Sequence, residues 1–191
     1  MAKQVTAEEV LGTKSGKPVI GLKGDDRVVA AFRAPEGVDV IAVASDGQVL
    51  RMPLESISVQ GRGAGGVAGM KLKGDAEIVG VGPVIGDGVV LTITSDSAAK
   101  ATPFEEFESK GRGGQGVRVA KLGAKETLTL AWFGTLGSLG GGGDLLAQMA
   151  DDEDPKKLDP NPVPFDVEAS KRDLVPTKTE RQVMVLGPSR W

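Results

Sequence analysis

The sequence predicts an all-β, propeller-like repeat array of four-stranded blades, about 50 residues per repeat, in an incomplete ring. Three observations support this prediction. The chain of 191 residues holds 28 glycines and 11 prolines, too many for a helix bundle. Short β-branched and apolar runs are followed by turn residues such as Ser45-Asp46-Gly47. The same motifs also recur at a fixed spacing, which is the signature of a repeat architecture.

The repeat can be followed position by position without gaps. Lys23-Gly24-Asp25 recurs as Lys73-Gly74-Asp75, and Ser45-Asp46 recurs as Ser95-Asp96. So many coincidences at one spacing exclude two similar but unrelated hairpins. Further pairs 50 residues apart are Pro53 and Pro103, Arg62 and Arg112, Gly63 and Gly113, Gly66 and Gly116, Val67 and Val117, and Lys71 and Lys121.

Each repeat is expected to supply four strands. The first two form a hairpin that ends at a proline, which cannot donate to a sheet ladder. A glycine-rich loop, a third strand and a fourth strand follow. The expected strands are 40–44 and 89–94 (first), 49–52 and 98–101 (second), 69–72 and 119–122 (third), and 77–82 and 127–132 (fourth), with 27–30 as the matching segment of a partial blade.

The blade repeats are expected over residues 1–133, as a partial blade 1–37 and two repeats, 38–87 and 88–133. Residues 4–10 resemble 51–57 at a spacing of 47. The chain is therefore expected to begin inside a blade, as part of a longer protein.

The remainder divides in two. Residues 134–164 are rich in glycine, acidic residues and proline, and we interpret them as a flexible, solvent-exposed insertion with a possible short helix at 144–149. Residues 165–191 are expected to close the last blade, with a final strand at 182–186.

The composition excludes several chemistries. The chain has no Cys, His or Tyr, so it cannot build the usual zinc sites, a Ser-His-Asp triad or a tyrosine nucleophile. It contains no Walker-type ATP motif, and we expect no catalytic residues and no cofactor in this chain, although its parent could be an enzyme. No apolar run is long enough for a signal peptide or a membrane span, which favours the cytoplasm and excludes a membrane partner.

Acidic residues offer weaker candidates. Asp25-Asp26 and the run 151–154 are better explained as a turn and a solvated loop than as metal ligands, so no metal site is expected. Glu55 and Glu105 recur as paired carboxylates, which a hydrolytic propeller would need. Both follow a proline turn in a solvated position, so we consider that function improbable.

Two glycine-rich loops, 60–66 and 110–116, carry the strongest functional signal. Glycines let backbone amides approach a phosphate, and an arginine adds a charged fork that fits phosphate oxygens. Basic residues flank both loops. The candidate phosphate-binding residues are Arg51, Arg62, Gly63, Gly66, Lys71, Lys73, Lys100, Lys110, Arg112, Gly113, Gly114, Gly116, Arg118 and Lys121.

These motifs resemble a known family. A proline-ended hairpin, then a degenerate form of Gln-Arg-Arg-Gly-Gly-Lys-Gly, then Val-x-x-x-Lys-Leu is similar to the C-terminal β-pinwheel repeat of bacterial type IIA topoisomerase A subunits, those of DNA gyrase and topoisomerase IV. The resemblance covers about residues 4–133. It implies a bent disc of blades with duplex DNA around a positively charged rim.

The resemblance also implies partners and differences. The partners would be duplex DNA, the N-terminal cleavage core of the parent subunit and, through it, the ATPase subunit. Arg62 and Arg112 match the second arginine of the family's loop, whereas its first arginine is Gly61 and Gly111 here, and its lysine is Gly65 and Gln115. This pattern resembles the degenerate loops of topoisomerase IV more than those of a strongly wrapping gyrase.

Charge and the lack of base-reading motifs shape the expected activity. The net charge of −3 and the pI near 5.2 are unlike those of a typical DNA-binding domain, so the basic residues would have to form a local stripe. Binding is then expected to ignore base sequence and to depend on DNA curvature. The alternative is a β-propeller-like protein-interaction scaffold without DNA binding.

Overall fold

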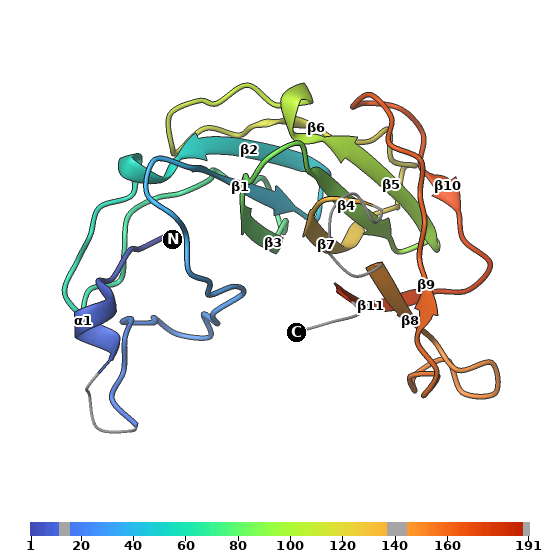
Figure 1. Cartoon of the computed structure of the whole chain (residues 1–191), viewed down its shortest axis with the longest axis horizontal. Coiled ribbons are helices and arrows are strands. Elements are labelled where there is room, and N and C mark those ends of the chain that lie inside the picture. The colour runs from blue at the N-terminus through green and yellow to red at the C-terminus, as the bar shows by residue number, and fades with distance from the viewer. Residues whose placement is uncertain (12–15, 137–144, 189–191) are drawn as a thin grey trace.

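A computed structural model describes residues 1–11, 16–136 and 145–188, which fold into short antiparallel sheets joined by long loops. Figure 1 shows the sheets side by side in an open arc, with the N-terminal segment at one end and β8, β9 and β11 at the other. The helical elements are α1 (Ala7–Val10) and the 3₁₀ helices Leu54–Ser56 and Phe104–Glu106.

Two sheets have four strands each, which confirms the all-β array of four-stranded units. The first blade has the order β3 (Ile78–Pro83), β1 (Asp39–Ala44), β2 (Gln48–Pro53), β6 (Val117–Arg118). The second blade has the order β7 (Leu128–Gly134), β4 (Val89–Thr94), β5 (Ala98–Pro103), β10 (Thr177–Lys178). A third sheet contains β11 (Val183–Pro188), β8 (Leu145–Met149) and β9 (Val163–Pro164).

The outermost strand of each blade comes from the repeat that follows it. β6 pairs with β2, where Gln48 faces Arg118, and β10 pairs with β5, where Thr177 faces Ala99. The third strand predicted at 119–122 is therefore displaced, since the ladder lies at Val117–Arg118, and the strand predicted at 69–72 is wrong. Each repeat therefore contributes its outermost strand to the sheet of the preceding repeat, which ties neighbouring repeats together.

The apolar side chains are buried between neighbouring blades. Ile41 and Val43 pack with the second blade, in a cluster that includes Val90, Phe107 and Leu128. Val40 and Ala42, on the opposite face of the same strand, belong to a different cluster on the N-terminal side of the first blade. Both faces of the hairpin strands are thus buried, which explains why they are continuous apolar runs.

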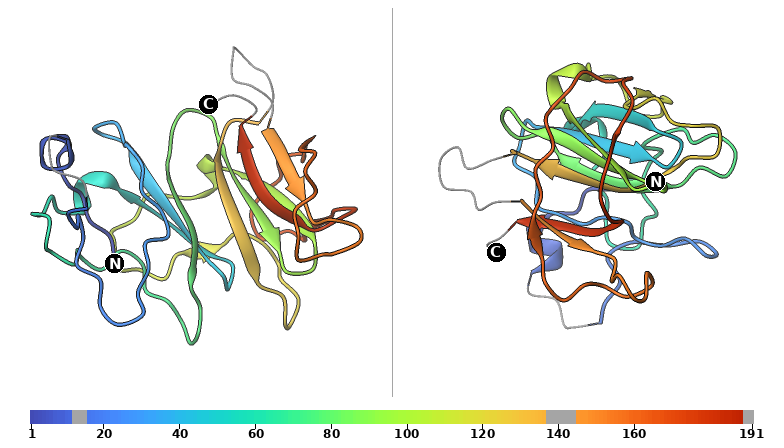
Figure 2. Two further views of the ribbon diagram at one scale, coloured as in Figure 1. Left: turned by 90° about the horizontal axis from the view of Figure 1, so that it is seen from below. Right: turned by 90° about the vertical axis from the view of Figure 1, so that its right-hand side faces the viewer.

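The innermost strands of the two blades approach closely because one of them lacks side chains at two positions. A Cβ atom on Gly82 of β3 would lie 2.6 Å from the Phe133 ring of β7, and one on Gly80 would lie 2.9 Å from the Cβ of Ala131. The views in Figure 2 show these strands side by side. Glycine at these positions allows the contact between the two blades.

Two expectations at the ends of the array are wrong. Residues 27–30 are not a strand, and Val28 and Val29 are 54% and 47% exposed, because no described strand lies beside them as β1 lies beside β3. The short helix expected at 144–149 is the strand β8 over 145–149, with Leu145 and Ala147 buried, so this part is not a solvent-exposed insertion. Position 144 lies outside the described residues.

The third sheet continues the repeat. The N–H of Ser45 donates to Glu77 O, that of Ser95 to Thr127 O and that of Ala150 to Gln182 O. In all three repeats the same hydrogen bond therefore joins the first hairpin strand to the start of the inner strand. β11 confirms the strand expected at 182–186. This repeat lies off the 50-residue spacing already at its hairpin, since Ala150 stands 55 residues after Ser95, and the long β8–β9 connection, 150–162, then replaces the short turns of the other hairpins.

Candidate nucleic-acid interface

Three loops, not two, occupy matching places in the array. The N–H of Gly21 donates to Ala64 O (3.2 Å), that of Lys71 to Gly114 O (2.9 Å) and that of Lys121 to Leu174 O (3.0 Å). We call them loop 1 (residues 60–66), loop 2 (residues 110–116) and loop 3 (residues 170–176).

Loop 3 was missed in the sequence. It lies 60 residues after loop 2 and contains no glycine, so neither spacing nor composition indicated it. Its Lys171 and Arg172 stand at the places of Gly111 and Arg112 and are exposed. The sequence signal for loop 3 is the pair Lys171-Arg172, which aligns with Gly111-Arg112 once a gap of ten residues is allowed.

The last glycine of loops 1 and 2 has a structural role. Gly66 and Gly116 have φ of +88° and +82°, and a Cβ on Gly116 would collide with the carbonyl of Val49. The backbone here crosses the second hairpin strand of the preceding blade, so only glycine fits. At the place of Gly113 (φ +82°), loop 3 has Asp173 with φ +61°.

The loop arginines are tied to backbone carbonyls. Arg112 donates from Nε to Ser56 O at 2.9 Å and from Nη1 to Ala68 O at 3.2 Å. Arg62 donates from Nε to Pro18 O at 3.4 Å. Both side chains therefore fasten loops to neighbouring segments, in addition to any contact with DNA.

A lysine ammonium lies behind loops 1 and 3. Lys3 Nζ donates to the carbonyls of Val19, Gly61, Arg62 and Ala64 at 2.9, 2.6, 2.9 and 3.1 Å. Lys100 Nζ donates to Ser170 Oγ at 2.6 Å and to Lys171 O at 2.7 Å. Leu50 holds the corresponding place under loop 2.

The placement of Lys100 corrects the sequence prediction that it contacts DNA. Lys100 is 2% exposed, and burial lowers the pKa of its ammonium group, an effect that the nearby carboxylate of Glu106 opposes. Arg51 is also turned inward, because its Nε donates to Asp39 Oδ2 at 2.6 Å and its Nη1 to Phe104 O at 3.2 Å. Neither side chain is placed as a free surface cation.

The remaining candidate cations reach the surface. Lys71, Lys73 and Lys121 are exposed, and their side chains have no ion pair within the described parts of the chain. Lys110 lies 3.7 Å from Glu108, and Arg118 lies 2.9 Å from Asp173. Lys71 stands beside loop 2 and Lys121 beside loop 3, so two successive repeats build each basic site.

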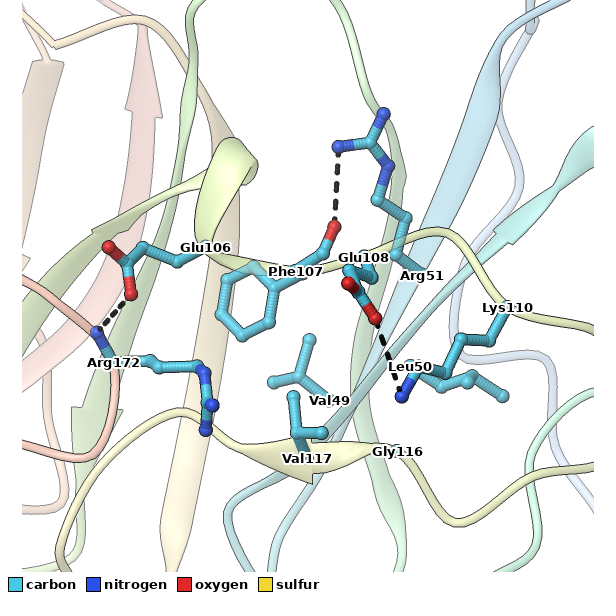
Figure 3. A pocket seen from close by; sticks show the side chains of 10 residues that line it. All are labelled: Val49, Leu50, Arg51, Glu106, Phe107, Glu108, Lys110, Gly116, Val117 and Arg172. Carbon is cyan, nitrogen blue, oxygen red and sulfur yellow. Dashed lines mark hydrogen bonds and ion pairs between the residues drawn. The ribbon is translucent and has the colours of Figure 1, made fainter.

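A cavity of about 290 Å³ opens between loops 2 and 3 (Figure 3). Its charged lining is mixed, since Arg51, Lys110 and Arg172 face it together with Glu106 and Glu108. Figure 3 shows the Glu106 carboxylate directed at the backbone nitrogen of Arg172, at 3.3 Å. An anion entering this cavity would meet both signs of charge.

The model of the DNA gyrase C-terminal domain, a β-propeller, matches residues 1–35, 39–85 and 88–131. The chain belongs to this family. No curated protein sequence matches it. The gyrase C-terminal-domain repeat thus covers the part of the chain where the 50-residue spacing holds.

Solved structures of gyrase and topoisomerase IV C-terminal domains share this fold. The crystal structure of the C-terminal domain of DNA topoisomerase IV matches with TM-score 0.79 and 21% identity, over 97% of this chain and 58% of that one. The structure of the DNA gyrase A C-terminal domain matches with TM-score 0.68 and 18% identity, over 89% of this chain and 57% of that one. The structure of the E. coli ParC C-terminal domain matches with TM-score 0.60 and 9% identity, over 81% of this chain and 62% of that one. The chain spans less than two thirds of each.

The described residues of this gyrase C-terminal-domain homologue contain no group of three or more acidic side chains placed to hold a metal ion. Among the same residues, no helix is long and apolar enough to cross a membrane.

Proposed function

We propose that this chain is the non-catalytic, DNA-binding C-terminal part of a type IIA topoisomerase A subunit. It binds bent duplex DNA through phosphate contacts along the rim of the blades and does not read base sequence. One observation carries the proposal: the repeat sets unpaired lysines, Lys71 and Lys121, beside successive loops at matching places. Lysines at a regular spacing match a polyanion with a regular spacing of charge.

The structure changes the contact set inferred from the sequence. We remove Lys100 and Arg51, whose cationic groups are engaged inside the fold. We assign Gly66 and Gly116 to backbone packing and add Lys171 and Arg172 of loop 3. The proposed phosphate contacts are Arg62, Gly63, Lys71, Lys73, Lys110, Arg112, Gly113, Gly114, Arg118, Lys121, Lys171 and Arg172.

The proposed partners follow from family membership. The chain acts with the N-terminal cleavage core of its parent subunit and, through that core, with the ATPase subunit, in the cytoplasm. The parent enzyme supplies the ATP-dependent change of DNA topology. This part contributes DNA contact and needs no cofactor of its own.

A fluorescence titration with labelled duplex DNA at two salt concentrations tests the proposal. Each phosphate contact adds about −0.9 to the slope of log K against log salt. Lys71→Ala/Lys121→Ala is expected to weaken binding and to flatten the slope by about 1.8. The control is Lys125→Ala/Lys156→Ala, which removes the same charge from exposed lysines outside the proposed contact set. Equal effects of the two double variants contradict the rim contacts.

The alternative scaffold function has one observation in its favour. Val28, Val29 and Phe32 are 54%, 47% and 43% exposed in a segment that matches a partly buried inner strand of the complete blades. An unpaired apolar segment can accept a protein strand. Absence of DNA binding by the wild type at low salt would favour the scaffold.

A further inference from the structure

A lysine and a glutamate lie behind loop 1 and behind loop 3, and neither residue type occupies these places behind loop 2. Lys100 and Glu106 lie six residues apart behind loop 3, and Lys3 and Glu9 hold the corresponding places behind loop 1. At loop 2 the same two places are Leu50 and Ser56. Ser56 and Glu106 are both the last residue of a 3₁₀ helix, which fixes their equivalence.

The lysines determine which way the loop amides point. In a trans peptide, the carbonyl of one residue and the N–H of the next point in opposite directions. Because the carbonyl of Lys171 faces the Lys100 ammonium, the N–H of Arg172 points away from it. The carbonyl of Gly61 faces Lys3 in the same way, so the N–H of Arg62 points away from it.

The carboxylate of Glu106 accepts a hydrogen bond from the outward-pointing amide of loop 3. Glu106 Oε2 accepts from the Arg172 N–H at 3.3 Å, at the edge of the cavity between loops 2 and 3 (Figure 3). A backbone N–H that binds a carboxylate can equally bind a phosphate oxygen. Behind loop 1, Glu9 Oε2 is shielded from solvent without a hydrogen-bond partner, and Oε1 lies 4.0 Å from the Cβ position of Gly61.

We propose that the Glu106 carboxylate competes with a DNA phosphate for loop 3, and that Glu9 has the same effect at loop 1. Loop 2 has a neutral serine in that place, so its Arg112 N–H, which has no protein partner in the described structure, donates to a phosphate without displacing an acid. This proposal rests on the proposed DNA-binding function. It makes loop 2 the strongest phosphate site of the array.

Glu106→Gln and Glu105→Gln test the competition. Both variants remove one negative charge, but Glu105 is exposed and its carboxylate has no partner in the described structure. Glu106→Gln is expected to bind labelled duplex DNA about fivefold more tightly than Glu105→Gln, with a slope of log K against log salt that is steeper by about 0.9. Equal affinities and slopes for the two variants overturn the proposal.

The reciprocal variants do not depend on the folding of Glu106→Gln. Ser56→Glu introduces the acid at loop 2 and is expected to weaken DNA binding about fivefold relative to Ser58→Glu, which adds the same charge at an exposed neighbour. Equal weakening overturns the proposal.

A direct readout separates this proposal from the DNA-binding function. Inorganic phosphate is titrated into ¹⁵N-labelled protein, and the amide signals of Arg112 and Arg172 are followed by NMR. The Arg112 signal is expected to shift in the wild type, and the Arg172 signal only in Glu106→Gln. If DNA fails to bind while these shifts occur, the DNA-binding function fails and the carboxylate competition stands. A shift of Arg172 that is the same in both proteins refutes the competition.

Discussion

At Gly66 and Gly116 the absence of a Cβ atom allows the loop backbone to pass close to another segment of the chain. Each has a positive φ, and each lies against the backbone of the preceding blade, Ala2 and Val49 respectively. The sequence predicts that these glycines allow a phosphate to approach the backbone. In the structure the approach is between two parts of the same chain.

Gly116→Ala is expected to lower the free energy of unfolding by about 3 kcal/mol, because the added methyl group combines backbone strain with a collision at the Val49 carbonyl. The control is Gly74→Ala, where φ is +51° but no atom lies within 4 Å of the new Cβ. That variant should lose about 1 kcal/mol. Urea denaturation measures both, and losses of equal size would contradict the collision.

Lys100 is expected to make stability depend on pH. Burial lowers its pKa below the usual 10.5, so between the folded and unfolded pKa values the unfolded chain binds more protons. The free energy of unfolding therefore rises with pH across this interval. Lys100→Leu, which copies the residue at Leu50, lacks this contribution.

Urea denaturation of the wild type and Lys100→Leu at several pH values up to 10 tests this dependence. The difference between the wild type and the variant should grow in favour of the wild type as pH rises. A difference that does not change with pH would show that the lysine keeps its ordinary affinity for protons in the fold.

At the scale of elements, stability lies between the sheets. Phe107 is 1% exposed within the apolar cluster that joins the first and second blades. The 3₁₀ helix before it also belongs to this boundary, because its Phe104 lies in the same cluster. The blades are therefore held by mutual packing.

Phe107→Ala is expected to lower the free energy of unfolding by about 3–5 kcal/mol, since it leaves a cavity between the blades. Phe32→Ala removes the same group from a side chain that is 43% exposed and should cost less than about 1 kcal/mol. Chemical denaturation followed by circular dichroism distinguishes the two. A mild effect at Phe107 would mean that the blades do not stabilise one another there.

The hairpins could be predicted from sequence because their signals are local. Residues 40–44 and 89–94 are apolar, β-branched runs beside turn residues, and the observed strands are Asp39–Ala44 and Val89–Thr94. β8 could not be predicted, because Leu145–Met149 consists of good helix formers and becomes a strand by pairing with β11, distant in sequence. Residues 27–30 fail for the opposite reason, since their strand-like sequence has no partner.

The residue types of the candidate site could be predicted from the sequence, but the directions in which their side chains point could be predicted only in part. Arginine and glycine indicated loops 1 and 2, and both loops recur in matching places. The sequence does not show that carbonyls capture Arg112 or that Ser170 and Lys171 enclose Lys100. These partners come from the exchange of segments between repeats, which no local pattern encodes.

At the scale of the whole molecule, acidic and basic residues are nearly equal in number, so the positions of the charges matter more than their sum. The net charge is −3, so the proposed attraction to DNA depends on the placement of the exposed lysines. The sheets form an open arc, and the loops recur along it (Figure 1). The proposed phosphate contacts would follow this arc and would favour DNA that is already bent.

We therefore expect tighter binding to supercoiled than to relaxed plasmid. Bending 20–30 base pairs by 40–90° costs roughly 1–6 kcal/mol, which relaxed DNA must supply from its contacts. About four to six phosphate contacts give a slope of log K against log salt near −4 to −5. Competition between the two plasmid forms at several salt concentrations checks both numbers. Equal affinity for the two forms would indicate contact at a single loop.

The close contact of Gly80 and Gly82 with Ala131 and Phe133 also has a geometric consequence. Two glycines on one inner strand let the inner edges of the two blades approach more closely than larger residues would allow, which favours a wedge-shaped pair. The angle of that wedge sets the radius of the arc. Side-chain volume at the inner strands is then a means by which evolution can tune the radius without altering any residue that faces the ligand.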